Sequence, residues 1–131
     1  MSTAENEMHE YQAGDLVQAE VRTGVYAAEF MERNGPRALV SIKAVLKHPE
    51  QGDLHQPYNP DAAMFHERRA LSYTEKTNVL LRDLKPYRGE LPDYKLSLHA
   101  AVEAEKRSLD SLLRWAAKSL ELLEQLEKDY R

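Results

Sequence analysis

Cysteine is absent from all 131 residues of the chain. This absence excludes disulfide bonds, thiolate metal ligands, a cysteine nucleophile and thioether-linked lipid anchors. Long hydrophobic runs are lacking as well, since no apolar stretch approaches the ~20 residues that span a bilayer. The N-terminal residues have neither the basic region nor the apolar region of a signal peptide. We therefore expect a cytoplasmic protein without direct membrane insertion.

An excess of positive charge is also missing. The chain carries 18 Lys and Arg against 22 Asp and Glu, a formal net charge of -4. No segment has the basic surplus that neutralises phosphates, which argues against nucleic-acid binding. The five glycines are scattered singly, so there is no phosphate-binding glycine loop, and no Gly-x-Ser-x-Gly elbow is present. The sequence gives no positive sign of an enzyme, and we expect no catalytic residues and no cofactor.

What remains is an ordinary globular composition, with 42% hydrophobic and 31% charged residues. The first residues are acidic and non-periodic, and we predict a disordered acidic tail over 1–11. The period of the apolar residues is then two up to about residue 92, which is typical of strands, and changes to a helical period from 93 onward. The predicted organisation is therefore a β domain over 12–92 followed by a helical segment over 93–131.

The β domain is predicted from alternation. Val17, Ala19 and Val21 alternate with polar side chains, the pattern of a strand with one wet face. Turns are expected at Thr23-Gly24, where glycine accepts a positive φ, and at Asn34-Gly35. The predicted strands cover residues 15–22, 25–31, 40–46, 64–74 and 77–86.

Five short strands in a flat sheet would leave bare edges. Closure into a small SH3-like β-barrel removes those edges, and this is the fold we predict. Aromatic side chains at alternating positions (Tyr26, Phe30, Phe65 and Tyr73) could form a stacking platform, but we favour core positions for them. The predicted core of the barrel includes Val17, Val21, Phe30, Val40, Ile42 and Leu71.

A long loop interrupts the strands at residues 48–63. It holds three of the six prolines and few apolar residues, and long loops in compact domains are usually functional. We predict that the loop over 48–64, with its flanks, binds a macromolecular partner, with Leu54 as an apolar contact framed by Asp53 and His55. The alternative is that the same polar residues hold the loop against the barrel. The candidate partner-binding residues are His48, Gln51, Gly52, Asp53, Leu54, His55, His66 and Arg68.

The histidines of the same loop allow a second hypothesis, a small-ligand or metal-binding module. Imidazole and carboxylate groups suit Zn²⁺, and the possible ligands are His48, Asp53, His55, His66 and Glu67. Their spacing matches no metal motif. We therefore favour a structural role for these groups and predict no metal site.

The C-terminal segment has a helical pattern of apolar residues. Ser108 and Asp110 are residue types that begin helices, and they follow a polar run. We predict an antiparallel helical pair at about 94–107 and 111–130, with one long kinked helix as the alternative. The second helix has two apolar stripes and needs two neighbours. We expect the barrel to cover one of them, and another chain is the alternative.

Three stretches carry unusual motifs, at residues 46–55, 65–71 and 85–94. The first contains His-Pro-Glu-Gln-Gly-Asp-Leu-His, the second is Phe-His-Glu-Arg-Arg-Ala-Leu, and the third contains Lys-Pro-Tyr and Pro-Asp-Tyr. On these motifs the chain, from about residue 11 to its end, resembles the kinase-associated protein B family of endospore-forming bacteria, also called kinase-associated lipoprotein B.

The resemblance implies an SH3-like barrel followed by a helical pair. It also implies a non-catalytic role with a membrane-bound sporulation sensor histidine kinase that feeds the phosphorelay, which the protein would help to activate. The family offers no catalytic residues to carry over. Because this chain has no cysteine, it cannot itself carry the lipid that the name suggests, and we expect recruitment to the membrane through its partner. The oligomeric state stays open.

Overall fold

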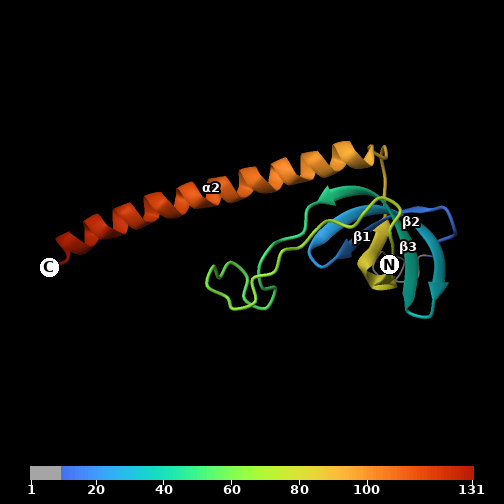
Figure 1. The fold of residues 1–131 in the computed structure, drawn as a ribbon, viewed down its shortest axis with the longest axis horizontal. Helices are drawn as coiled ribbons and strands as arrows, with labels where there is room; N and C mark the ends of the chain where they lie inside the picture. The colour runs from blue at the N-terminus through green and yellow to red at the C-terminus, as the bar shows by residue number, and fades with distance from the viewer. Residues whose placement is uncertain (1–9) are drawn as a thin grey trace, which may run out of the picture.

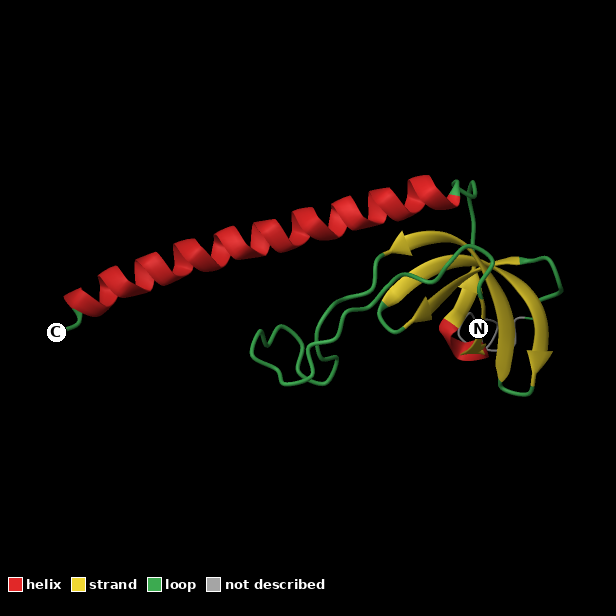
Figure 2. Cartoon of the chain, viewed as in Figure 1, coloured by secondary structure: helices red, strands yellow, loops and turns green. Residues whose placement is uncertain are grey.

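The computed structural model describes residues 10–131, so the predicted tail over 1–11 lies almost entirely outside the described residues. One antiparallel sheet and one long helix make up the described fold (Figures 1 and 2). No described helix has a stretch apolar and long enough to cross a membrane. In chain order the elements are β1 (Leu16–Val21), β2 (Gly24–Asn34), β3 (Arg37–Lys47), β4 (Lys76–Leu80), the 3-10 helix η1 (Leu81–Asp83), β5 (Leu84–Pro86) and α2 (Tyr94–Asp129).

The five strands form one sheet in the order β4-β3-β2-β1-β5. The strand predicted at 77–86 is divided by η1 into two short strands, which lie at opposite edges of the sheet. Three register shifts interrupt the pairing of β2 with β3, and irregularities of this kind, such as β-bulges, bend a sheet. The edge strands β4 and β5 are not paired with each other, however, so the sheet is not closed. The prediction of a closed SH3-like barrel is wrong in this respect.

The predicted strand at 64–74 is also wrong. Residues 48–75 form one irregular excursion between β3 and β4. Its return limb bonds to the backbone of the sheet at its end, where the Thr74 N–H donates to the Ile42 carbonyl at 2.7 Å and the Ile42 N–H to the Glu75 carbonyl at 2.9 Å. Alternation alone misled the prediction, because a strand also needs a neighbour to pair with.

The core is built mainly from side chains of the sheet. Val17, Val40 and Ile42 are fully buried and Phe30 almost so, as predicted. Val21 and Leu71, predicted for the same core, are partly buried and pack against its edge. Among the aromatic candidates Tyr26 and Phe30 are core residues, whereas Phe65 and Tyr73 are each more than half exposed. The core assignment of these two is wrong because both lie on the irregular excursion.

The first hairpin turns differently from the prediction. Arg22 and Thr23 carry the positive φ angles, 49° and 72°, while Gly24 begins β2. A Cβ atom on Gly24 would lie 2.6 Å from the Tyr26 hydroxyl oxygen and 2.9 Å from Cγ of Pro49. The glycine is therefore required by close packing rather than by its φ angle.

The C-terminal segment is one helix, so the predicted helical pair is wrong. Asp93 caps it by accepting a hydrogen bond from the Leu96 N–H at 3.1 Å. The sequence contains no Gly or Pro between Tyr94 and Asp129 to end the helix. Asp110, which resembled a cap, instead accepts a hydrogen bond from Arg114 one turn later at 3.0 Å. Here the capping residue types Ser108 and Asp110 do not start a new helix, because no Gly or Pro before them ends the first one.

Candidate partner-binding surfaces

The long loop is closed at its neck by a side-chain clasp. The Gln51 side chain donates to the Arg68 carbonyl at 2.9 Å and to the Pro49 carbonyl at 3.0 Å, and accepts from the Arg68 N–H at 2.8 Å. The Arg68 guanidinium donates to the carbonyls of Glu50 and Gly52. The two limbs of the loop are therefore joined although no strand pairing connects them.

Gly52 adds a backbone hydrogen bond to the same neck. Its N–H donates to the His66 carbonyl at 2.9 Å. Its φ of +98° belongs to the region that favours glycine, and a Cβ would lie 3.1 Å from the Phe65 ring. Asp53 begins the tip of the loop by accepting a hydrogen bond from the His55 N–H at 2.8 Å, an Asx turn.

The structure thus divides the predicted site residues into two groups. Gln51, Gly52, His66 and Arg68 meet in the neck, and His48 lies beside them with Nδ1 2.9 Å from the Pro49 carbonyl. Asp53, Leu54 and His55 lie beyond the neck. The Gln51 and Arg68 side chains and the backbone groups of Gly52 and His66 bond to one another within the loop and so hold it in shape, while Leu54 and the His55 ring are exposed.

The tip of the loop carries apolar side chains that the sequence analysis did not select. Tyr58 is 79% exposed and Met64 59% exposed, and Phe65 is similarly open. A signal was present only for Tyr58, a large apolar residue within a proline-rich segment that has no strand or helix period and so no regular face with which to reach a core. We name Leu54, Tyr58, Met64 and Phe65 the loop-tip patch.

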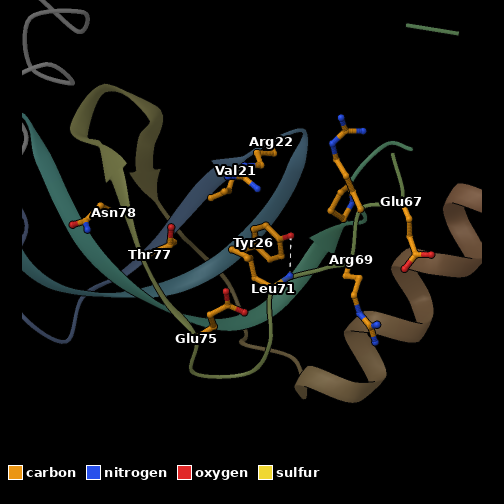
Figure 3. Close-up of a pocket in the computed structure, with 11 residues that line it drawn as sticks. Val21, Arg22, Tyr26, Glu67, Arg69, Leu71, Glu75, Thr77 and Asn78 are labelled. Carbon is orange, nitrogen blue, oxygen red and sulfur yellow. Dashed lines mark hydrogen bonds between the residues drawn. The ribbon is translucent and has the colours of Figure 1, made fainter. Parts of the chain in front are cut away.

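A cavity of about 430 Å³ lies at the base of the loop (Figure 3). The Tyr26 hydroxyl lies within it and accepts a hydrogen bond from the Leu71 N–H at 3.2 Å. Burial raises the pKa of Tyr26, so the phenol stays neutral in the physiological range. The charged residues of the lining include Arg22, Arg69 and Glu75. Side chains of both charge signs therefore line the cavity.

The alternative of a metal module finds no support in the geometry. Throughout residues 10–131, no three His, Cys, Asp or Glu side chains lie together in a way that could hold a metal ion. His48 and His66 are placed at the neck, and His55 lies past it. The histidines that are close in sequence are thus divided between two parts of the loop.

The second apolar surface belongs to α2. Its first turns pack on the sheet, where the Ser97 hydroxyl accepts a hydrogen bond from the Val45 N–H at 2.9 Å and Ala101 is buried. Beyond these turns the helix projects away from the sheet (Figure 1). The expectation that the barrel covers one of the two apolar stripes of residues 111–130 is therefore wrong. The exposed large apolar residues of this part are Leu109, Leu112, Leu113, Trp115, Leu120, Leu122, Leu123, Leu126 and Tyr130.

These features define a class: a small β-sheet protein with two apolar surfaces, the loop-tip patch and the projecting helix, held outside its core. Three comparisons specify it further. The family model of kinase associated protein B matches residues 21–131. Kinase-associated lipoprotein B of Bacillus subtilis (strain 168) is 44% identical over 124 residues, which cover 94% of this chain and 97% of that protein.

A solved structure agrees. The X-ray crystal structure of kinase-associated protein B from Bacillus cereus is 38% identical, covers 92% of this chain and 98% of its own, and superposes with a TM-score of 0.68. The chain belongs to the kinase-associated protein B family, as its motifs indicated.

Proposed function

We propose that this protein is a non-catalytic accessory factor that binds a membrane-bound sensor histidine kinase and supports its activation at entry into sporulation, where the kinase feeds the phosphorelay. Family membership supports an association with a kinase. The protein acts in the cytoplasm and reaches the membrane through the kinase. In this proposal the protein acts on the kinase by binding to it and catalyses no reaction itself.

The loop-tip patch carries the kinase contact in this proposal, and this patch is the observation on which the proposal rests. The clasp between Gln51 and Arg68 fixes the two limbs of the loop, so little conformational entropy is lost when its tip docks. Tyr58 and Met64 offer exposed apolar area at the tip, and Leu54 and His55 lie on the same loop. Aromatic side chains framed by polar groups are typical centres of binding energy. The remaining candidates, His48, Gly52, Asp53, His66 and Arg68, shape the loop that presents them.

The test uses the full chain and the cytoplasmic parts of the sensor histidine kinases encoded in the same genome. Binding is measured by calorimetry, and activation by the rate of kinase autophosphorylation. The double variant Tyr58→Ser/Met64→Ser removes exposed side chains only, so the unfolding free energy stays within about 0.5 kcal/mol of the wild type. We expect it to weaken binding by about tenfold or more, the effect of truncating a hot-spot residue.

Two outcomes decide the role of the loop. Loss of binding at unchanged thermal stability supports the loop-tip patch as the contact. Full binding and full stimulation by the double variant would contradict it, as would a wild-type protein that neither binds nor stimulates any of the kinases. The variants Leu54→Ala and His55→Ala map the neighbouring part of the tip in the same assays.

A further inference from the structure

The exposed face of α2 continues the face with which the same helix packs on the sheet. Residues eleven apart lie almost on one line along a helix, because eleven residues complete about three turns. Leu112 and Leu123 thus extend the line of the buried Ala101, and Leu109 and Leu120 extend the line of Leu98, which packs against the core. One apolar face therefore runs the length of the helix, and the sheet covers only its beginning.

The uncovered part is long. From Lys106 to the end of the chain every residue is exposed except the half-buried Ala116 and Ser119. Leu120 and Leu123 expose 61% and 60% of their surface. Nine large apolar side chains between Leu109 and Tyr130 are exposed in this way. Such an area is more than the scattered apolar exposure of an ordinary surface.

The charges of the segment indicate what covers this face. Residues 106–118 carry four basic side chains and one acidic side chain, Asp110. Residues 119–131 carry four acidic side chains and two basic ones. The two halves are therefore opposite in net charge and similar in length. A second copy of the same helix laid antiparallel brings the positive half of each helix beside the negative half of the other.

Parallel pairing would have the opposite effect, since it sets positive against positive and negative against negative. It would also bring the two sheets to the same end of the pair, whereas antiparallel pairing places them at opposite ends. The small residues Ala116 and Ser119 lie near the middle of the segment, where two antiparallel helices would cross and could approach closely. Antiparallel pairing of two identical helices would give an isologous, closed interface, as a symmetric dimer requires.

We propose that the protein forms a homodimer through antiparallel pairing of α2 over residues 106–130, with the apolar faces of the two helices covering each other. This inference goes beyond the proposed function and does not depend on a kinase. It differs from the role of the loop-tip patch, which belongs to another segment of the chain.

The first test is the mass of the full chain in solution, measured by sedimentation equilibrium. The wild type is expected to weigh twice the 15.1 kDa of the chain. Leu123→Glu places a charge at the centre of the apolar face and should yield a folded monomer, since Leu and Glu have similar helix propensities. The matched control is Gln125→Glu, which places the same charge on the outer face of the same turn and should remain a dimer.

The second test reads the direction of pairing. The variant Tyr130→Cys has a single thiol, because the wild type has no cysteine. A spin label attached to this thiol marks the end of the helix. Antiparallel pairing centred near residue 118 separates the two labelled backbones by about 36 Å, twice twelve residues at 1.5 Å each. Parallel pairing brings them within about 10 Å, the spacing of packed helices.

The outcomes divide cleanly. A dimer abolished by Leu123→Glu, retained by Gln125→Glu and with labels several turns of helix apart is the predicted result. A wild-type monomer at submillimolar concentration overturns the inference. So does a dimer that Leu123→Glu leaves intact, or one whose labels lie side by side.

Discussion

The sheet and the projecting part of α2 hold similar side chains in opposite environments. In the sheet, Val17, Val40 and Ile42 are completely buried, whereas Leu113 and Leu120 on the helix expose more than 60% of their surface. Hydrophobic stabilisation is proportional to the apolar area removed from water. The stability of the isolated chain is therefore located in the sheet and in the first turns of the helix. In our proposals, the apolar residues of the loop tip and of the distal helix serve contacts with other molecules instead.

The largest effect is expected when the same kind of truncation is made in the two regions. Ile42→Ala removes a fully buried side chain and should lower the unfolding free energy by about 2–5 kcal/mol. Leu113→Ala removes an exposed one and should change it by no more than about 0.5 kcal/mol. Denaturant unfolding of both variants at a concentration that favours the monomer measures this difference. Equal losses in the two variants would contradict the division of the molecule.

The second prediction concerns the junction between the two regions. Ser97→Ala leaves the Val45 N–H, which donates to the Ser97 hydroxyl, without a partner in a buried position. The expected loss is about 1–3 kcal/mol, the cost of an unsatisfied buried donor. Ser108→Ala, on the exposed part of the same helix, is the matched control and should be nearly neutral. If the two variants melt alike, the first turns of α2 are not docked on β3 as described.

A smaller and local effect is expected in the loop. Gln51→Ala removes both side-chain bonds to Arg68 across the neck, and each is worth about 1 kcal/mol. The neck should then open more often without unfolding of the sheet, because the bonds of the Arg68 guanidinium and of the Gly52 N–H remain. Hydrogen exchange should accelerate at the amides of Gly52 and Arg68 and stay unchanged at the Val40 amide. Uniform acceleration over the whole chain would show that the loop and the sheet unfold as one unit.

The smallest effect is on the dependence of stability on pH. Burial raises the pKa of Tyr26 above its ordinary value of 10.0, against a smaller lowering by the hydrogen bond from Leu71. The folded state therefore favours the neutral phenol. Its contribution is complete below about pH 10 and is lost as the pH rises through the folded pKa.

Tyr26→Phe should flatten the fall of stability above pH 10, by at most about 1.4 kcal/mol per pH unit, the slope for one proton. The two proteins are compared by this slope, because the lost hydrogen bond lowers the unfolding free energy of Tyr26→Phe at every pH. Denaturant unfolding at several alkaline pH values gives this slope. An unchanged slope would contradict the prediction.

The sequence predicted correctly those strands that have both an alternating pattern and a neighbouring strand to pair with. The alternation in residues 15–46 corresponds to β1, β2 and β3, which pair with one another along the sheet. The same alternation at 64–74 had no strand beside it and gave an irregular limb. The edge positions of β4 and β5 depend on η1, a single helical turn at Leu81–Asp83. This turn is too short to produce a periodic pattern in the sequence.

The helix shows the complementary failure. Capping residues at 108–110 predicted two helices, but without Gly or Pro the propensity of the flanking residues prevails and one helix continues. The motifs in residues 46–55 and 65–71 identified the family directly. The motifs did not indicate which of their residues bond to one another within the loop. The clasp between Gln51 and Arg68 joins residues that are 17 positions apart, and no local pattern reveals such a contact.

The most direct test of the binding role of the projecting helix uses a probe already in the chain. Trp115 is the only tryptophan, and it is 66% exposed on the apolar part of α2. Its emission should shift to the blue as the wild-type protein is concentrated and a second helix covers the ring, while Leu123→Glu should keep the emission of a solvent-exposed tryptophan at every concentration. Identical, solvent-exposed emission from the wild type and Leu123→Glu throughout the series would contradict the account.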